Sequence, residues 1–383
     1  MSPSNQDCGK TDVAAIRIHR WVRRNLITPL AIQMAEPKQV GESPAFSVAD
    51  ALKNPQRILL VPDSRPGGLF IGASKFWAIR ERYPDASLDL LAHRKKDYIA
   101  AEIPFIDKVI LYDNFLLPLG PRRREVITAL RSRDYDLAFC FCTDEDFCPT
   151  YFCYKSGAHV RVGFRKDDTP FFNIRIVPGE TPAYEPDRLS LLLDLLGIPE
   201  AREGVSWTVS EEGAKKIRDR FLVGGHTDDR YVGIDVSAAP NEGLSVKQWL
   251  AIAQAAANRA RVLIFFNYQE RKEANQIKEA LGQKALMFQN EDLPRQVVLI
   301  GLCDQVVAAN TDIFHLAVAM GRPVIGLFDE EQARRWVPRD RPNVDLCVLS
   351  DLRSMGVSEL DSQFREKLSP RSPVTGSTEF AEP

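Results

Sequence analysis

Short apolar runs alternate with amphipathic segments along most of the chain. The run at 57–63, "RILLVPD", is typical of a strand buried on both faces, and a glycine-containing turn separates it from a helix-like segment at 69–84. A strand at 87–93 and two helix–strand pairs, at 95–113 and 123–141, continue the series. This alternation predicts a parallel sheet covered by helices on both faces.

The alternation starts again in the second half of the chain. Further strands are predicted at 231–237, 261–267 and 284–289, within 294–310, and at 323–328, where the series closes; helices are predicted at 245–260, at 269–282 and within 294–310. The sequence therefore predicts an α/β protein with two Rossmann-like, doubly wound lobes. Ligands of such lobes bind in the cleft outside the carboxyl ends of the strands.

The predicted organisation of the 383 residues has four parts. They are an N-terminal helical appendage and linker at 1–56, a first lobe at 57–195, a second lobe at 196–350, and a tail at 351–383. The end of the tail is rich in Pro, Ser and Thr, a composition typical of disorder, so we expect the tail to be partly disordered.

The N-terminal appendage contains a basic segment. Residues 13–25 carry four arginines and a histidine without an acid, and Thr28-Pro29 is typical of a helix start, so two short helices are predicted. Two interpretations remain open: docking on an anionic membrane face, or packing on the protein's own surface. No run reaches the ~18–20 apolar residues that a membrane span needs.

Charge and cysteine content narrow the class of protein. A net charge of −2 does not favour a nucleic-acid-binding protein. The seven cysteines, an odd number without a secretory signal, indicate reduced thiols in a cytosol. Four of them cluster in "CFCTDEDFCPTYFC" at 140–153, but the spacing does not match common zinc sites. We therefore predict no metal and interpret this cluster as a strand and the loop after it.

Several segments, in order, resemble one family. They are "RILLVPDSRPGGLFIGASKFWAIRERYPDASLDLLAH", "SGAHVRVGF", "YVGIDVSAAP" before "KQW", "FFNYQERKEA" and "NTDIFHLAVAMGRPVIGLF". The last resembles the run Asp-Ser/Thr-Gly-x-x-His-Leu-Ala-x-x-x-Gly-x-Pro, the hallmark of glycosyltransferase family 9, the bacterial heptosyltransferases. The resemblance extends over about residues 57–338.

This resemblance implies a GT-B fold and an inverting sugar transfer. The donor would be a nucleotide sugar, typically ADP-heptose, and the acceptor a lipopolysaccharide or another envelope glycan, with no metal or other cofactor. The second lobe would hold the donor and the first the acceptor. The donor-binding residues implied in this way are Ser237, Ala238, Glu270, Asn310, Thr311, Asp312 and His315.

The hallmark run is only partly kept. Family members place an acid, a hydroxyl and a glycine at the helix start, where free N–H groups and the helix dipole hold the donor diphosphate. The hydroxyl of Thr311 and the imidazole of His315 are kept, but Asn310 replaces the acid and Asp312 the glycine. A carboxylate here would cap the helix and repel a diphosphate, by about 4 kcal/mol per charge pair at ~4 Å and an effective dielectric constant of ~20.

Two other family positions also differ. Counting back from the end of the first helix places Gly67 and Gly68 where relatives have Gly-Asp, whose acid is the expected general base. Asp63, at the preceding strand end, is the candidate replacement; its alternative role is to initiate the turn. Glu242 falls where relatives carry a phosphate-binding lysine, and Lys247 lies five residues further on.

Glu270 falls where relatives place a glutamate near the nucleotide, so it is the candidate partner of the ribose hydroxyls; the alternative is a solvated glutamate at a helix start. The changes at 242 and 312 both make the presumed phosphate site more negative. Either the donor phosphates are held differently, with Arg322, Arg334 and Arg335 as candidates, or the chain does not use ADP-heptose.

Three functions therefore remain open. The first is an active glycosyltransferase with altered donor and base positions, located in the cytoplasm, with peripheral contact with the inner membrane if the N-terminal helices dock there. The second is an inactive relative that binds a glycan or a partner transferase. The third is another GT-B-like enzyme of sugar nucleotides, such as an epimerase. A dinucleotide oxidoreductase is disfavoured, because no Gly-x-Gly-x-x-Gly follows the first strand of either lobe.

Overall fold

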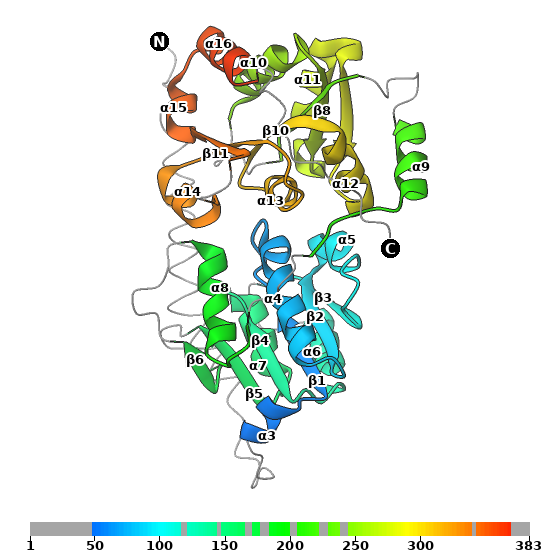
Figure 1. Cartoon of the computed structure of the whole chain (residues 1–383), viewed down its shortest axis with the longest axis vertical. Helices are drawn as coiled ribbons and strands as arrows, with labels where there is room; N and C mark the ends of the chain where they lie inside the picture. Colours follow the sequence, from blue (N-terminus) through cyan, green and yellow to red (C-terminus); the bar gives the residue numbers. More distant parts are fainter. Residues whose placement is uncertain are drawn as a thin grey trace. The chain divides into compact units, whose positions relative to one another are not determined.

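The computed structural model describes nine stretches of the chain, and its contacts divide the protein into two compact units, residues 1–205 and 206–383 (Figure 1). The stretches are 48–115, 121–143, 147–164, 171–176, 184–199, 205–221, 229–237, 244–338 and 342–368. The predicted N-terminal helices, Ala238, Glu242 and residues 369–383 lie outside them. The division between the units follows Val205, after the boundary that we expected at 195.

The first unit is built on a six-stranded parallel sheet in the order β3-β2-β1-β4-β5-β6. The strands are β1 (Arg57–Val61), β2 (Ser87–His93), β3 (Lys108–Tyr112), β4 (Leu137–Cys140), β5 (Val160–Phe164) and β6 (Ile174–Ile176). The α-helices are α3 (Val48–Lys53), α4 (Gly68–Arg82), α5 (Asp97–Ala100), α6 (Pro121–Arg131), α7 (Phe147–Lys155) and α8 (Glu185–Asp194), and a 3-10 turn, η2 (Arg94–Lys96), precedes α5.

The second unit repeats this plan in the order β12-β11-β10-β7-β8-β9, again fully parallel. The strands are β7 (Tyr231–Asp235), β8 (Arg261–Phe266), β9 (Ala285–Gln289), β10 (Cys303–Ala309), β11 (Val324–Phe328) and β12 (Val344–Val348). The helices are α9 (Glu211–Phe221), α10 (Val246–Ala257), η4 (Tyr268–Glu270), α11 (Arg271–Leu281), η5 (Gly282–Lys284), α12 (Leu293–Leu302), α13 (Asp312–Ala319), α14 (Glu330–Trp336), α15 (Leu349–Ser354) and α16 (Val357–Lys367).

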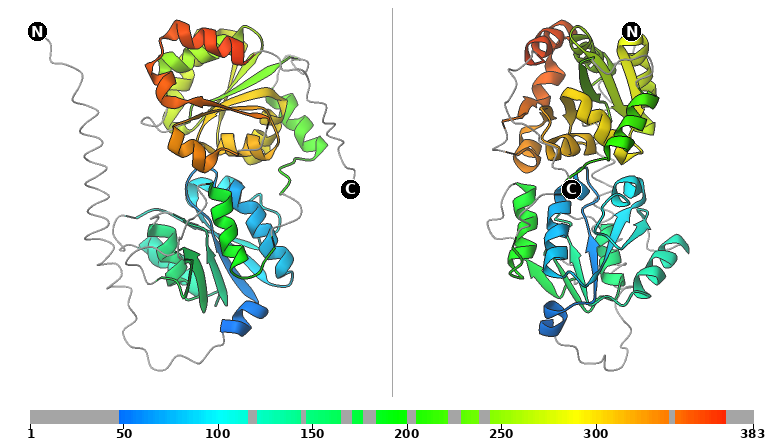
Figure 2. Two further views of the ribbon diagram at one scale, coloured as in Figure 1. Left: turned by 60° about the vertical axis from the view of Figure 1, so that its left-hand side comes forward. Right: turned by 45° about the vertical axis from the view of Figure 1, so that its right-hand side comes forward.

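Both sheets are doubly wound, as the alternation of strands and helices predicted. Each chain half starts at a central strand, adds two strands on one side, and then crosses to the other side. Helices cover both faces of each sheet (Figure 2). The crossing creates a switch point between β1 and β4 in the first unit and between β7 and β10 in the second. Such switch points are where ligands of α/β sheets bind.

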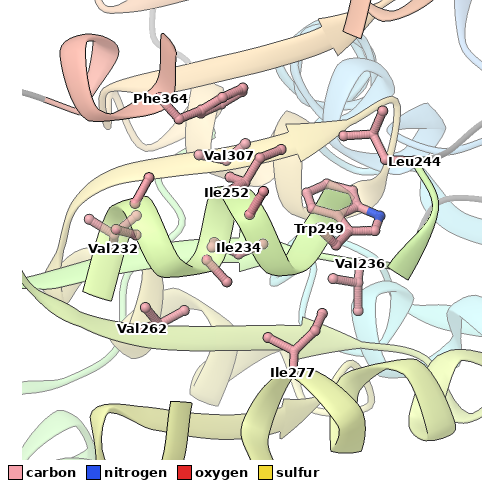
Figure 3. Close-up of a cluster of buried hydrophobic side chains, with 14 of the residues drawn as sticks. Val232, Ile234, Val236, Leu244, Trp249, Ile252, Val262, Ile277, Val307 and Phe364 are labelled. Carbon is pink, nitrogen blue, oxygen red and sulfur yellow. The ribbon is translucent and has the colours of Figure 1, made fainter. Parts of the chain in front are cut away.

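The core of the second unit shows why α10 lies on its sheet. Trp249 and Ile252 of α10 face Ile234 and Val262 of the central strands, and Phe364 of α16 closes the cluster from the other side of α10 (Figure 3). Ser245 and Gln248 form a capping box that starts α10. Burial of these apolar side chains contributes roughly 1.5–3 kcal/mol for each large residue.

Two predictions about the end of the chain were wrong. The strand series does not close at 323–328, because β12 pairs in parallel with β11. Residues 351–368, which we placed in the tail, form the end of α15 and all of α16, and Leu360 and Phe364 are fully buried in the core of the second unit. We predicted a tail from the Pro-, Ser- and Thr-rich composition of the residues after 368, and extended it to residues whose apolar spacing is that of a helix.

The cysteine cluster was also predicted incorrectly in part. Cys140 ends β4, but Cys148 and Cys153 lie on α7 rather than in a loop. These three cysteines and Cys142, the fourth of the cluster, are all fully buried in the core of the first unit. In the described stretches of the chain, no group of three or more His, Cys, Asp and Glu side chains is placed to hold a metal ion.

Candidate functional site

Polar side chains gather at the carboxyl edge of the second sheet. Asp235 ends β7, Glu270 follows β8, Asn310-Thr311-Asp312 follow β10, and α14 follows β11. These four strands are consecutive in the parallel sheet, in the order β11-β10-β7-β8. Their ends therefore meet at one edge, which includes the switch point between β7 and β10.

Thr311 is the N-cap of α13. Its hydroxyl oxygen accepts a hydrogen bond from the backbone N–H of Phe314 at 3.4 Å. The same hydroxyl donates to a carboxylate oxygen of Asp235 at 2.5 Å. Thr311 is thus kept as the predicted hydroxyl of the hallmark run, but its proton is directed to a buried acid within the protein. This contact ties the start of α13 to the end of β7.

His315 lies one turn into α13 and is buried. Its Nε2 lies 2.9 Å from the side-chain oxygen of Asn310. Because an amide oxygen only accepts hydrogen bonds, Nε2 carries the proton. The ring also packs edge-on against Trp336 of α14, with 5.7 Å between the centroids. The hallmark histidine is therefore held in place from both β10 and α14.

Asp235 has no exposed surface. Its carboxylate accepts from Thr311 and from the backbone N–H of Ser237, the latter at 3.1 Å. Burial raises the pKa of Asp235 to about 6, against the lowering effect of these hydrogen bonds, and the nearby charge of Asp312 raises it further. This acid was not among the predicted site residues. The only signal for it was a carboxylate at the end of an otherwise apolar strand.

Glu270 carries an oxygen atom that is buried without a hydrogen-bond partner among the described residues. Burial raises its pKa, and the charges of Asp235 and Glu273 contribute in the same direction. Asp235 pairs in register with Phe265 of β8, and Glu270 follows the end of that strand, so the two acids belong to neighbouring strand ends. A buried carboxylate oxygen without a partner is suited to accept a hydrogen bond from a ligand hydroxyl.

Cations at this edge are few in the described stretches. Arg322 is not one of them, because its guanidinium donates to the carbonyl of Cys303 at the opposite, amino end of β10. Our suggestion that Arg322 holds donor phosphates was therefore wrong. Arg334 and Arg335 lie on α14, beyond the end of β11, and Lys247 is exposed in the first turn of α10.

The carboxyl edge of the first sheet holds a cluster of charged side chains at its own switch point. Asp63 follows β1, and its carboxylate accepts from the Arg65 backbone N–H at 2.9 Å, from Arg65 Nε at 2.8 Å and from Arg65 Nη2. Arg65 also donates to Thr143 at 2.9 Å and to Glu185 at 3.0 Å. Both oxygens of Asp63 are therefore engaged by one guanidinium.

Arg65, Thr143 and Glu185 are residues of this cluster that the sequence did not reveal. Glu185, at the start of α8, is 2 % exposed; it accepts a hydrogen bond from the Thr143 hydroxyl and pairs with Arg188 at 3.4 Å. Asp63 and Glu185 are far apart in sequence, so only the fold brings them together around Arg65.

Gly67 and Gly68 shape the turn before α4. Gly67, the N-cap, has a φ of +76°, a conformation that favours glycine. A Cβ atom on Gly68 would lie 2.2 Å from the backbone oxygen of Asp63. The position that the family resemblance equates with the general base therefore has no room for a side chain in this backbone.

None of the helices in the described stretches has the length and apolarity needed to cross a membrane.

Comparison with known proteins agrees with this fold. A family model described as "Glycosyltransferase family 9 (heptosyltransferase)" matches residues 123–355, more than half of the chain. The segment with Asp63, Gly67 and Gly68 precedes the matched range. No protein matches in a search of curated sequences.

Solved structures of the same architecture include two heptosyltransferases from E. coli. ADP-heptose LPS heptosyltransferase II is 18% identical, with a TM-score of 0.63, over 81% of this chain and 99% of that one. Heptosyltransferase WaaC with ADP-2-deoxy-2-fluoro heptose is 16% identical, with a TM-score of 0.59, over 81% and 99% of the two chains.

A family 9 glycosyltransferase from Veillonella parvula is 15% identical, with a TM-score of 0.63, over 78% of this chain and 87% of that one. The two doubly wound units define a protein of the GT-B class. Within that class, the chain belongs to glycosyltransferase family 9, the heptosyltransferase family.

Proposed function

We propose that the protein transfers a sugar from a nucleotide-sugar donor, with ADP as the nucleotide, to a lipopolysaccharide or another envelope glycan. The observation that carries this proposal is the buried, unpartnered oxygen of Glu270. It lies at the same sheet edge as the hallmark residues Thr311 and His315. A ribose hydroxyl would supply the hydrogen bond that this oxygen lacks. The ADP-heptose analogue named with the E. coli heptosyltransferase WaaC supports ADP as the nucleotide.

In this proposal the second unit holds the donor, with Ser237, Asn310 and Asp312 beside the residues above. Asp63 is retained as the candidate general base. It would act only after one of its oxygens is released from Arg65, because both now accept hydrogen bonds from that guanidinium. The reaction proposed here requires no metal ion. The proposed location is the cytoplasm, where the nucleotide sugar is available, with the basic N-terminal segment contacting the inner membrane.

Thermal unfolding in the presence of nucleotides tests the donor site. We expect ADP at about 100 times its Kd to stabilise the protein by about 2.7 kcal/mol, and UDP and GDP to do so less. Glu270→Gln keeps the shape of the side chain but replaces a carboxylate acceptor, so it should weaken ADP binding by about tenfold. Glu279→Gln, an exposed change on the helix α11 that Glu270 precedes, is the matched control. If no nucleotide stabilises the wild-type protein, the proposal is wrong.

A second candidate function is a family member that binds the donor or a glycan without transferring the sugar. The first unit favours it, because Gly68 has no room for a carboxylate and Asp63 is held by Arg65. The two candidates differ in turnover. An active transferase releases ADP from an ADP-sugar in the presence of acceptor, and Asp63→Asn abolishes this release. A binding protein retains the ADP-sugar intact under the same conditions.

A further inference from the structure

Three acceptor oxygens without partners lie where β8 and β9 end. They belong to Glu270 and Glu273, after β8, and to the side-chain amide of Asn290, the first residue after β9; each is buried and makes no hydrogen bond with the described residues. The backbone N–H of Asn290 donates to the carbonyl of Phe266 at 2.8 Å, which fixes the end of β9 beside the end of β8. Acceptors that lack a donor within the protein suit a ligand that carries several donors.

An exposed aromatic ring lies on the same turn as the first of these acceptors. Tyr268 opens the 3-10 turn η4, two residues before Glu270, and is 71 % exposed. Its side chain makes no hydrogen bond or ring contact with the described residues. A single exposed tyrosine is ordinary on a protein surface. Beside an unpartnered acceptor at a sheet edge where ligands bind, however, its flat face offers a stacking surface for a base.

The order of the strands gives each part of a nucleotide a place along this edge. The order is β10-β7-β8-β9, so the end of β9 lies three strand spacings from the end of β10, about 14 Å. In the proposed function the ribose lies at Glu270, after β8, and the diphosphate lies on the side of the hallmark run after β10. The base is then directed away from β10, toward the end of β9.

The side chain of Asn290 suits one base in particular. Its amide oxygen accepts a hydrogen bond and its amide nitrogen donates one. Adenine presents an amino group beside a ring nitrogen, and an asparagine amide pairs with these two groups through two hydrogen bonds. Asn290 is partly exposed, so its amide can turn toward a base that lies on Tyr268.

We propose that the nucleoside of the donor binds across the ends of β8 and β9, with adenine stacked on Tyr268 and paired with the amide of Asn290. This inference rests on the proposed function, because it assumes that a nucleotide sugar is bound at this edge. Glu270 and Glu273 then supply one acceptor for each of the two ribose hydroxyls. The choice of base is made at the end of β9, outside the hallmark run.

Calorimetric titration of ADP and of purine riboside diphosphate, which is ADP without the amino group, tests the pairing. The wild type should prefer ADP by about tenfold, because the amide oxygen of Asn290 stays unpaired when the analogue binds. Asn290→Ala should reduce this preference to within about twofold. Asn290→Asp keeps an acceptor for the amino group and should retain the preference.

Titration of ADP into variants of the turn tests the stacking. Tyr268→Ala should weaken ADP binding by about 5- to 150-fold, the range for loss of base–aromatic stacking. Tyr268→Phe keeps the ring and should stay within about twofold of the wild type. Gln269→Ala, an exposed change at the next residue, is the matched control and should also stay within about twofold. Thermal unfolding without nucleotide checks that each variant remains folded.

Three results overturn the inference while the proposed function stands. The first is equal affinity of the wild type for ADP and for purine riboside diphosphate. The second is a preference for ADP that Asn290→Ala retains in full. The third is an ADP affinity that Tyr268→Ala leaves equal to that of Gln269→Ala. If the wild type binds no ADP, the proposed function is wrong, and the inference is wrong with it.

Discussion

At the scale of single residues, the pair Asp235–Thr311 explains how an acid is tolerated inside the second sheet. The Thr311 hydroxyl and the Ser237 backbone N–H compensate part of the loss of hydration, but burial still dominates and raises the pKa of Asp235 to about 6. The carboxylate form is therefore a source of instability at neutral pH.

The consequence for stability can be measured. The pKa of Asp235 is higher in the folded protein than its ordinary value of 3.8, so the folded chain binds more protons between about pH 4 and pH 6. The contribution of this group to the free energy of unfolding falls as pH rises through that window and stays low above it. The full change is about 3 kcal/mol for a shift of about two pKa units.

Asp235→Asn removes this titration and keeps an acceptor for Thr311. We expect the difference in unfolding free energy between Asp235→Asn and the wild type to grow by about 3 kcal/mol, in favour of the variant, between pH 4 and pH 7. Urea unfolding at several pH values measures it. Asp304→Asn, at an exposed ion pair with Arg230, should show no such growth. A constant difference for Asp235→Asn across this range would contradict the assignment.

At the scale of elements, the spacing of apolar residues in α16 is sufficient to predict this helix from the sequence. Leu360 and Phe364 are four residues apart on α16 and both face the core, while the residues between them are more exposed. This spacing is that of an amphipathic helix, and it could have outweighed the composition of residues 369–383, on which our prediction of a tail rested.

Phe364→Ala tests whether α16 belongs to the second unit. Phe364 is fully buried beside α10, so its truncation should lower the free energy of unfolding by about 3–5 kcal/mol. Glu366→Ala, at an exposed position of the same helix, should change it by less than about 0.5 kcal/mol. Urea unfolding compares the two variants. Equal small effects would mean that α16 is not a stable part of the core.

Most of the helices and strands could be predicted from the sequence, because their apolar residues either recur with a helical period or form a continuous run. The strands β1, β7 and β10 are largely apolar, because helices cover both faces of a parallel sheet, and they lie where we expected. Helix α7 was missed because Phe147–Cys153 is buried on all sides and has no polar face, so its pattern does not differ from that of a strand and loop.

The site was less predictable than the fold. Thr311 and His315 could be found because they lie in one short motif. Asp235 and Glu185 could not, because their roles come from partners 76 and 42 residues away, Thr311 and Thr143. Distances of this kind follow from strand order, which local patterns do not give.

At the scale of the whole molecule, each unit has its own sheet and its own core. Two cores in one chain are expected to unfold with separate transitions unless the contact between them is large. The donor-site residues identified above all belong to the second unit, so a bound nucleotide should stabilise that unit first.

Differential scanning calorimetry tests this expectation. We expect two transitions, of which ADP raises the midpoint of only one. Asp235→Asn should alter the same transition, because Asp235 lies in the core of the second unit. Phe364→Ala should lower the midpoint of that transition and leave the other within about 1 °C. A single transition that ADP raises as a whole would contradict independent unfolding of the two units.

The tight approach of Gly68 to the backbone of Asp63 also limits how this turn can be redesigned. An acid could be introduced at most exposed turns by one substitution. Here the turn around Gly67 and Gly68 must first widen, a change with no benefit of its own while Arg65 holds Asp63. A single substitution at Gly68 therefore cannot place a carboxylate here without moving the backbone of Asp63, so an engineered acid at this turn requires at least one further change.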